Sequence, residues 1–284
     1  MANTIDIRRR IRSVRNTQQI TKAMKMVSAA KLRRAQERMF AARPYAAALR
    51  QVLSSVATRV EELKHPLLEA REEQKILLLV VTSDKGLCGA FNANVIKAAQ
   101  NAIRERGWTA VEVLPIGRKA NDFFRRHTLP IRREATQVFQ ALSLETAQEI
   151  ARTIVEDFVG GRVDAVYVAY NEFKSIIAQN VRVERLLPIE RAWDERENAI
   201  EYLYAPGPEQ ILNDLLPKHI EFQLYRILLE SAAAEQGARM SAMEAATKNA
   251  KEMIDHLTLT YNRIRQASIT KEIIEIVSGA AAQG

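Results

Sequence analysis

Both ends of the chain carry apolar residues at alternating three- and four-residue spacing, and this pattern constrains the fold most. At the N-terminal end the series runs for ten steps from Ser28 to Leu63. It extends back to Ile7, with polar residues at some of the positions. A series of this length is typical of a coiled-coil seam rather than of an ordinary amphipathic helix. Its positions are Ile7, Ile11, Val14, Gln18, Thr21, Ser28, Leu32, Ala35, Met39, Ala42, Ala46, Leu49, Leu53, Val56, Val60 and Leu63.

The same spacing returns after the "APGP" stretch at 205–208. Two helices of about 60 residues would each be roughly 90 Å long, and neither is stable in water without a partner. A compact middle must turn the chain around, so we expect the two helices to pack antiparallel. Pro44 should kink the first helix or disturb its hydrogen bonds. The second seam runs through Ile211, Leu215, Phe222, Tyr225, Leu229, Ala232, Met243, Ala246, Ala250, Met253, Leu257, Thr260, Ile264, Ala267, Ile274 and Val277.

The middle of the chain has a different period. "KILLLVVTS" at 75–83 is a continuous apolar run, as expected of a strand that is buried on both faces. Alternating strand-like and helix-like stretches predict a small α/β domain with a mostly parallel sheet. We expect helices near 92–106, 118–127 and 143–159, strands at 110–117, 163–173 and 178–189, and three domains at 1–63, 75–190 and 209–284.

Positive charge is concentrated in the first fifty residues. They hold thirteen Lys or Arg and two acids, a net charge of +11 in a chain whose total is +8. A solvated helix face normally mixes both signs, so this excess indicates an acidic partner: nucleic acid, an anionic membrane face or acidic protein loops. The strip has little of the aromatic interleaving that single-strand binding uses. Met24 and Met26 could slide against an apolar surface or simply pack in the coiled coil.

The glycine turn "TSDKGLCGAFN" at 82–92 raises the possibility of a phosphate site, with Lys85 as a contact. The spacing of neither common phosphate-binding glycine motif is present, however, so a structural turn with Cys88 as a small buried residue is favoured. His65, His127, His219 and His256 are scattered, and no pair has metal-ligand spacing. We therefore predict no catalytic residue, no cofactor and no metal.

The cellular location follows from what the sequence lacks. No apolar run approaches the roughly 20 residues that a membrane span needs, and the basic N-terminus has no secretory signal pattern. A single cysteine excludes an intramolecular disulfide and fits a reducing compartment. We expect a protein on the cytoplasmic side of a membrane or free in the cytoplasm.

Three separated motifs resemble the gamma subunits of F-type ATP synthases: "ITKAMKMVSAAKLRRAQ" (20–36), the glycine turn, and "RQASITKEIIEIVSGAAA" (265–282). The resemblance implies an antiparallel coiled coil of the two chain ends beside a Rossmann-like α/β domain. It also implies the central rotor of a proton-translocating synthase, present once per complex, with alpha and beta subunits, epsilon and the c-ring as partners and no nucleic acid. The expected location is the cytoplasmic face of a bacterial plasma membrane, as a peripheral protein.

The resemblance also assigns contact residues. The acidic lever loops of beta would meet the basic helix, and further beta contacts would come from the C-terminal helix. A foot in "YLYAP" would meet epsilon and the c-ring, although Ala205 stands where the family commonly has an acid. The C-terminal tail would turn as a slim axle end within the ring. The beta contacts are Lys22, Met24, Lys25, Arg33, Arg34, Arg239, Gln266, Thr270 and Glu272; the foot residues are Tyr202 and Ala205.

Two other functions remain open at this point. A basic coiled-coil protein would bind nucleic acid with a strong salt dependence. An α/β nucleotide enzyme would bind ATP at the 82–92 turn.

Overall fold

The computed structural model describes residues 4–57, 65–127, 129–140, 142–175, 179–190 and 207–281. The chain divides into two compact units. Residues 1–28 and 240–284 form the first, called the coil unit below, and residues 29–239 form the second, called the sheet unit. Two long helices contribute to both units: α1 (Thr4–Ala57) and α5 (Pro208–Ala281).

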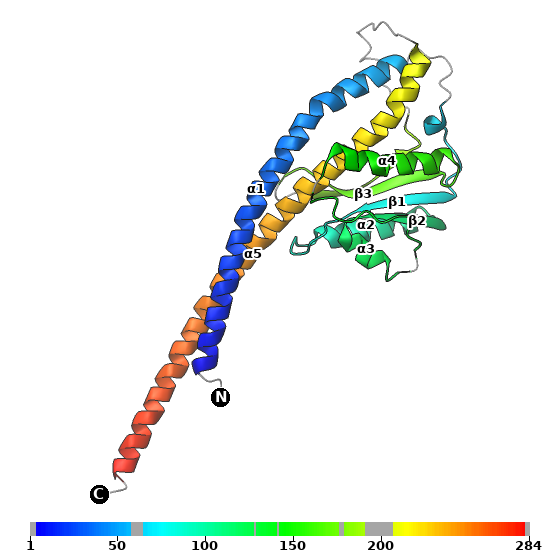
Figure 1. Ribbon diagram of the computed structural model, residues 1–284. Helices are drawn as coiled ribbons and strands as arrows, with labels where there is room; N and C mark the ends of the chain where they lie inside the picture. The colour runs from blue at the N-terminus through cyan, green and yellow to red at the C-terminus, as the bar shows by residue number, and fades with distance from the viewer. Residues whose placement is uncertain are drawn as a thin grey trace. The chain divides into compact units, whose positions relative to one another are not determined.

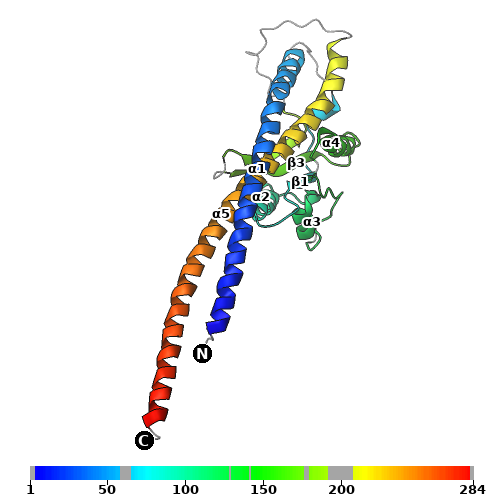
Figure 2. The ribbon, with the colours of Figure 1, turned by 60° about the vertical axis from the view of Figure 1, so that its left-hand side comes forward.

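The two long helices run antiparallel within each unit. In the coil unit, Arg8 contacts Tyr261 and the hydroxyl groups of Thr21 and Thr247 are 2.7 Å apart, so the numbers rise along one helix as they fall along the other. In the sheet unit the rings of Tyr45 and Phe222 pack together, with centroids 4.6 Å apart. Figures 1 and 2 show α1 and α5 side by side from two directions. The predicted antiparallel coiled coil is therefore confirmed.

Burial along α1 follows the predicted seam. Every predicted position from Ile7 to Val56 is buried or half-buried, while Val60 and Leu63 lie outside the described residues. The polar lapse at Thr21 is satisfied because its hydroxyl group pairs with Thr247 across the coil. The helix continues through Pro44, which is exposed, without a break.

The second seam lines α5 as far as the partner helix extends. Most predicted positions up to Ile264 are buried or half-buried, but Met253 is 53% exposed and differs from the prediction. Described residues of α1 begin at Thr4, which by the register of the coil lies opposite about residue 265. Beyond that point, residues 265–280 are all exposed within the described chain. The seam positions predicted in this tail are therefore exposed, because no described α1 surface is left to cover them.

The sequence pattern did not predict a second, deeper stripe on α5. This stripe and the predicted seam positions of this part of α5 join the same main core of the sheet unit, so α5 buries two faces there. Leu77, Leu79 and Val81 of the first strand lie in this same core. The stripe consists of Leu212, Leu216, Ile220, Leu224, Ile227 and Leu228.

The sheet has four strands in the order β2-β1-β3-β4. Strands β1 (Lys75–Val81), β2 (Ala110–Ile116) and β3 (Ala165–Phe173) are parallel, and β4 (Gln179–Leu187) pairs antiparallel with β3. The predicted mostly parallel sheet is present, and its last two strands, β3 and β4, form an antiparallel pair. The crossovers contain α2 (Phe91–Glu105), α3 (Arg118–Phe124) and α4 (Leu144–Val159), which begins at the side-chain cap of Ser143.

Helices cover both faces of the sheet. Alternate residues of β1 point to opposite sides: Leu77, Leu79 and Val81 join the core formed with α4 and α5, and Ile76 and Val80 join the core formed with α2 and α3. This two-sided burial explains the continuous apolar run of β1. In the described segments, no helix carries an apolar stretch that could cross a membrane. The division into domains at 1–63, 75–190 and 209–284 stays a prediction.

Candidate functional site

In the coil unit, three of the predicted contact residues lie close together on α1. Lys22 is exposed and Met24 is half-buried. Lys25 donates from Nζ to Oε1 of Glu244 on α5 at 2.6 Å. Both partners of this ion pair are substantially exposed, so the pair contributes little to stability. Exposed Lys22 keeps positive charge of α1 accessible beside the half-buried Met24.

The predicted contacts near the C-terminus lie on the exposed tail of α5. Gln266, Thr270 and Glu272 are all exposed. Their polar groups bond within the helix: the Thr270 hydroxyl group donates to the Gln266 carbonyl at 2.9 Å, and Ser268 donates to Glu272 at 3.2 Å. Gln266 follows Glu244 by 22 residues, a rise of about 33 Å along the helix. The tail contacts are thus a group separate from Lys25.

Arg33 and Arg34 are neighbours on α1 in the sheet unit with different surroundings. Arg33 is exposed and pairs with Glu37, one turn along the same helix, at 3.0 Å. Arg34 is also exposed, and among the described residues no carboxylate lies within ion-pair distance of it. Its side chain instead lines a cavity.

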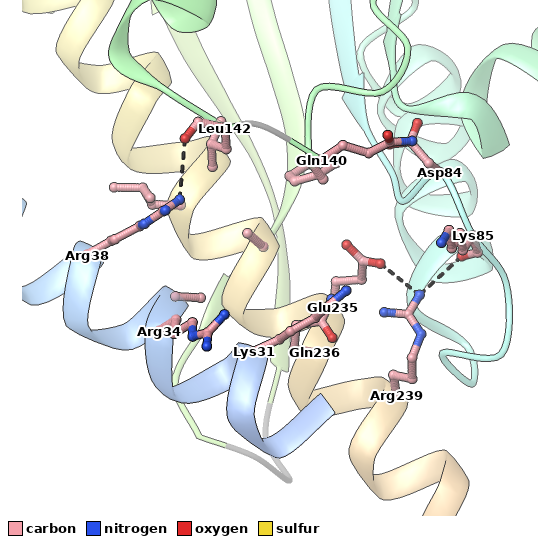
Figure 3. Close-up of a pocket in the computed structure, with 14 residues that line it drawn as sticks. Lys31, Arg34, Arg38, Asp84, Lys85, Gln140, Leu142, Glu235, Gln236 and Arg239 are labelled. Atoms are coloured by element: carbon pink, nitrogen blue, oxygen red, sulfur yellow. Dashed lines mark hydrogen bonds and ion pairs between the residues drawn. The ribbon is translucent and has the colours of Figure 1, made fainter. Parts of the chain in front are cut away.

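This cavity, called the basic cavity below, has a volume of about 420 Å³. It lies between α1, α5 and the loops that follow β1 and precede α4 (Figure 3). Five cationic and two carboxylate side chains line the cavity, and apolar side chains line another part of its surface. The lining residues are Lys31, Arg34, Ala35, Arg38, Asp84, Lys85, Phe139, Gln140, Leu142, Leu229, Ala232, Glu235, Gln236 and Arg239.

Arg239 is placed differently from an exposed contact residue. Only 8% of its surface is exposed, and Nη2 lies 2.7 Å from Oε1 of Glu235. The same nitrogen donates to the carbonyl of Lys85 at 3.3 Å (Figure 3) and to the carbonyl of Gly86, also at 3.3 Å. Burial raises the pKa of the Glu235 carboxyl, and the Arg239 charge partly opposes that shift. Arg239 therefore anchors α5 to the glycine turn.

The glycine turn is held together by hydrogen bonds between its own residues. Asn92 accepts from the Ser83 backbone N–H at 2.9 Å, and its amide donates to Sγ of buried Cys88 at 3.2 Å. Gly89 has a φ of 57°, which explains this glycine, whereas Gly86 has neither a positive φ nor a steric need. The predicted structural role of the turn is confirmed for Gly89 and Cys88. No group of three metal ligands occurs among the described residues.

Sequence reasoning missed the residues that complete the basic cavity. Lys31 and Arg38 lie on α1 but were not singled out there, Lys85 was considered only as a contact within the glycine turn, and Glu235 lies between recognised seam positions of α5. The spacing of Glu235 and Arg239, four residues apart on a helix, was a readable signal of their pairing. The foot residues Tyr202 and Ala205 lie outside the described residues.

Comparisons with known proteins cover nearly the whole length of the chain. A family model described as ATP synthase matches residues 3–283. The chain is similar to ATP synthase gamma chains of Solibacter usitatus (54% identical, covering 99% of both chains) and Geobacter sp. (52% identical, covering 99% of this chain and 98% of the relative).

Two solved structures show the same fold. A chain in the Tetrahymena thermophila mitochondrial ATP synthase central stalk and c-ring is 29% identical, with a TM-score of 0.61 over 80% of this chain and 99% of that one. A chain in the Euglena gracilis mitochondrial ATP synthase OSCP/F1/c-ring assembly is 20% identical, with a TM-score of 0.67 over 99% of this chain and 94% of that one.

Proposed function

Because this chain belongs to the ATP synthase gamma chain family, we propose that its two long helices form a rotor shaft between a membrane c-ring and an alpha/beta catalytic hexamer. A central-stalk subunit of this family is not itself catalytic. One copy would turn in each complex, with alpha, beta, epsilon and the c-ring as its partners. The observation that carries this proposal is 54% identity over 99% of both chains with an ATP synthase gamma chain.

The shaft would act by making different contacts with different beta subunits. Each beta subunit meets a different side of an asymmetric shaft, and only a contact whose free energy differs between beta conformations can shift their populations. Rotation of the shaft would therefore change the nucleotide affinity of each beta subunit in turn. This links ion flow to ATP synthesis without any reacting group on the chain itself.

We assign the contact with the acidic lever loops of beta to the basic side of α1. Lys22, Lys25, Arg33 and Arg34 supply charge there, and half-buried Met24 supplies an adaptable apolar contact. The exposure of Arg33 and Arg34 supports this role because an interface residue must reach its partner.

Further beta contacts would come from α5. The exposed Gln266, Thr270 and Glu272 can donate to or accept from a surrounding ring. Arg239 stays in the proposed contact set in addition to its internal bonds, although only 10% of its side chain is exposed. Tyr202 and Ala205 are the proposed foot toward epsilon and the c-ring.

The complex would hold the chain as a peripheral protein at the cytoplasmic face of a bacterial plasma membrane. Its proposed partners in that place are proteins, and nucleic-acid binding is not favoured because its full-length relatives are ATP synthase gamma chains. The three predicted domains, 1–63, 75–190 and 209–284, would then be the first shaft helix, the α/β domain and the second shaft helix.

Affinity purification of the tagged chain from source membranes, followed by identification of the subunits, tests the proposal. We expect alpha, beta, epsilon and the c subunit to be recovered together, with one tagged chain per complex. Recovery without alpha and beta would contradict the rotor assignment. Tight, salt-sensitive recovery with nucleic acid instead would support the alternative.

A further inference from the structure

The basic cavity carries more positive charge than its own carboxylates balance. Arg34, Lys31 and Arg38 lie on one side of α1, and Lys85 and Arg239 come from the glycine turn and α5. Figure 3 shows these side chains around one opening. The two lining carboxylates, Asp84 and Glu235, leave a net formal charge of +3 at the cavity.

Both carboxylates have partners within the chain, and Oδ2 of Asp84 is buried without a hydrogen-bond partner among the described residues. Oδ1 of Asp84 accepts from the backbone N–H groups of Arg118 and Gln137, each at 3.0 Å. Glu235 pairs with Arg239 at 2.7 Å. Within the described part of the chain, neither Lys31, Arg34 nor Lys85 has a carboxylate within ion-pair distance. These three cations are therefore the donors that a ligand could use.

Arg38 adds a directed group on the same side. One N–H of its guanidinium group donates to the Leu142 carbonyl at 3.4 Å, which orients the side chain over the cavity (Figure 3). A guanidinium group has five N–H donors in a fixed plane, so several remain for a ligand. The side chain is thus held in place by one bond while its charge stays unbalanced.

The size and the wall of the cavity fit a small ligand. A volume of about 420 Å³ lies in the range of small-molecule sites, which combine apolar walls with a few charged groups. Phe139, Leu142 and Leu229 supply the apolar part. The cations come from α1 and from the turn after β1. A phosphoryl group offers them three strong acceptor oxygens and a charge of about −1.5 to −2, whereas a carboxylate offers two oxygens and a single charge.

We propose that the basic cavity binds a phosphoryl anion, either orthophosphate or the phosphate groups of a nucleotide. Lys31, Arg34 and Lys85 bind the oxygen atoms, Arg38 adds charge, and the Glu235–Arg239 pair closes the inner wall. The cavity lies within the sheet unit and needs no partner subunit, so anion binding does not depend on the rotor assignment.

Isothermal titration of the isolated full-length chain with sodium phosphate, with metal-free ADP and with adenosine tests the proposal. We expect phosphate or ADP to bind with a dissociation constant below about 1 mM and adenosine not to bind. Displacement of phosphate by ADP would show that both use one site. Binding of ADP alone would identify the ligand as a nucleotide, and binding of phosphate alone would identify it as the free anion.

A matched pair of variants assigns the binding to the cavity. The triple substitution Lys31→Gln, Arg34→Gln and Lys85→Gln should weaken binding by at least about tenfold. The control Lys97→Gln, Arg104→Gln and Arg126→Gln removes the same charge from exposed positions elsewhere in the sheet unit and should leave binding unchanged. If a thermal melt shows that the cavity triple variant is unfolded, Lys85→Gln alone replaces it, since Lys85 is exposed.

Four results would overturn the proposal. One is the absence of binding by both phosphate and ADP. Another is equal loss of binding in the cavity and control variants, which would show general charge attraction. A third is equally tight binding of adenosine, which would show that no phosphoryl group is recognised. The last is binding of polyglutamate but of neither phosphate nor ADP, which would make the cavity a docking point for acidic protein segments.

Discussion

Arg239 and Glu235 form a buried ion pair on one face of α5, 2.7 Å apart, and the arginine also holds two backbone carbonyls of the glycine turn. The pair therefore joins a long helix to the loop that follows β1. Loss of either partner would leave the other buried without a counter-ion, so substitutions at this pair should affect stability strongly.

Arg239→Ala should destabilise the chain by about 3–5 kcal/mol, because Glu235 would stay buried without its partner. Arg33→Ala is the matched control, since Arg33 and Glu37 are exposed, and it should cost no more than about 1 kcal/mol. Urea denaturation of both variants measures the free energy of unfolding. Similar costs for the two variants would show that burial does not strengthen the Arg239 pair.

The pKa of Glu235 predicts a pH dependence of stability. Burial raises the pKa of this carboxyl above its ordinary value of 4.5. The folded state thus binds the Glu235 proton more tightly than the unfolded state does. The stability that this proton binding contributes is fully present below pH 4.5 and is lost as the pH rises through the raised pKa of Glu235. The free energy of unfolding of the native chain, relative to Glu235→Gln, should fall over that window. A difference that stays constant with pH would contradict this.

Gly117→Ala should destabilise the sheet unit by about 2–4 kcal/mol. Gly117 has a φ of 93°, and an added Cβ would lie 2.0 Å from the Thr82 carbonyl oxygen. Gly161→Ala is a useful comparison because it has a positive φ of 67° but nothing within 4 Å of the added Cβ. It should cost only the backbone strain, about 1 kcal/mol. Equal losses of unfolding free energy in the two variants, measured by chemical denaturation, would show that the contact between the added Cβ and Thr82 is relieved without an energetic cost.

Removal of Ala280–Gly284 should leave ATP-driven proton pumping by the assembled complex largely intact. A Cβ added at Gly279 would meet nothing within 4 Å, and Ala280 is exposed, so neither residue is packed against another part of the described chain. Removal of residues 266–284 should reduce pumping because it also deletes Gln266, Thr270 and Glu272. Pumping and hydrolysis rates in membrane vesicles measure both. A large loss from the short deletion would show that the tip makes essential contacts.

The sequence predicted packing best where a single periodic pattern marks the buried face of a helix. The α1 seam is an example, because from Ile7 to Val56 each predicted position faces other parts of the chain. On α5 the same reasoning found only one of two buried faces, because Leu216 and Leu224 pack on a sheet whose position no local pattern reveals. Met253 fits the spacing and is nevertheless exposed.

The candidate site shows the same limit. The excess charge of α1 was visible in the composition, but the cavity joins Arg34 to Lys85, which are far apart in sequence. Nor could spacing reveal that Arg239 is nearly buried, because its carbonyl partners belong to a loop more than 150 residues away. Contacts between distant segments depend on the tertiary fold.

The most direct test of the rotor account is the coupling of ATP hydrolysis to proton pumping in membrane vesicles that carry Lys25→Glu, Arg33→Glu and Arg34→Glu. Attraction to acidic loops would become repulsion, so we expect hydrolysis to slow or to continue with little pumping. The control Lys97→Glu, Arg104→Glu and Arg126→Glu changes the charge equally at exposed positions outside the proposed contacts and should stay coupled. Unchanged coupling in the first variant would show that the basic side of α1 is only a solvated helix face.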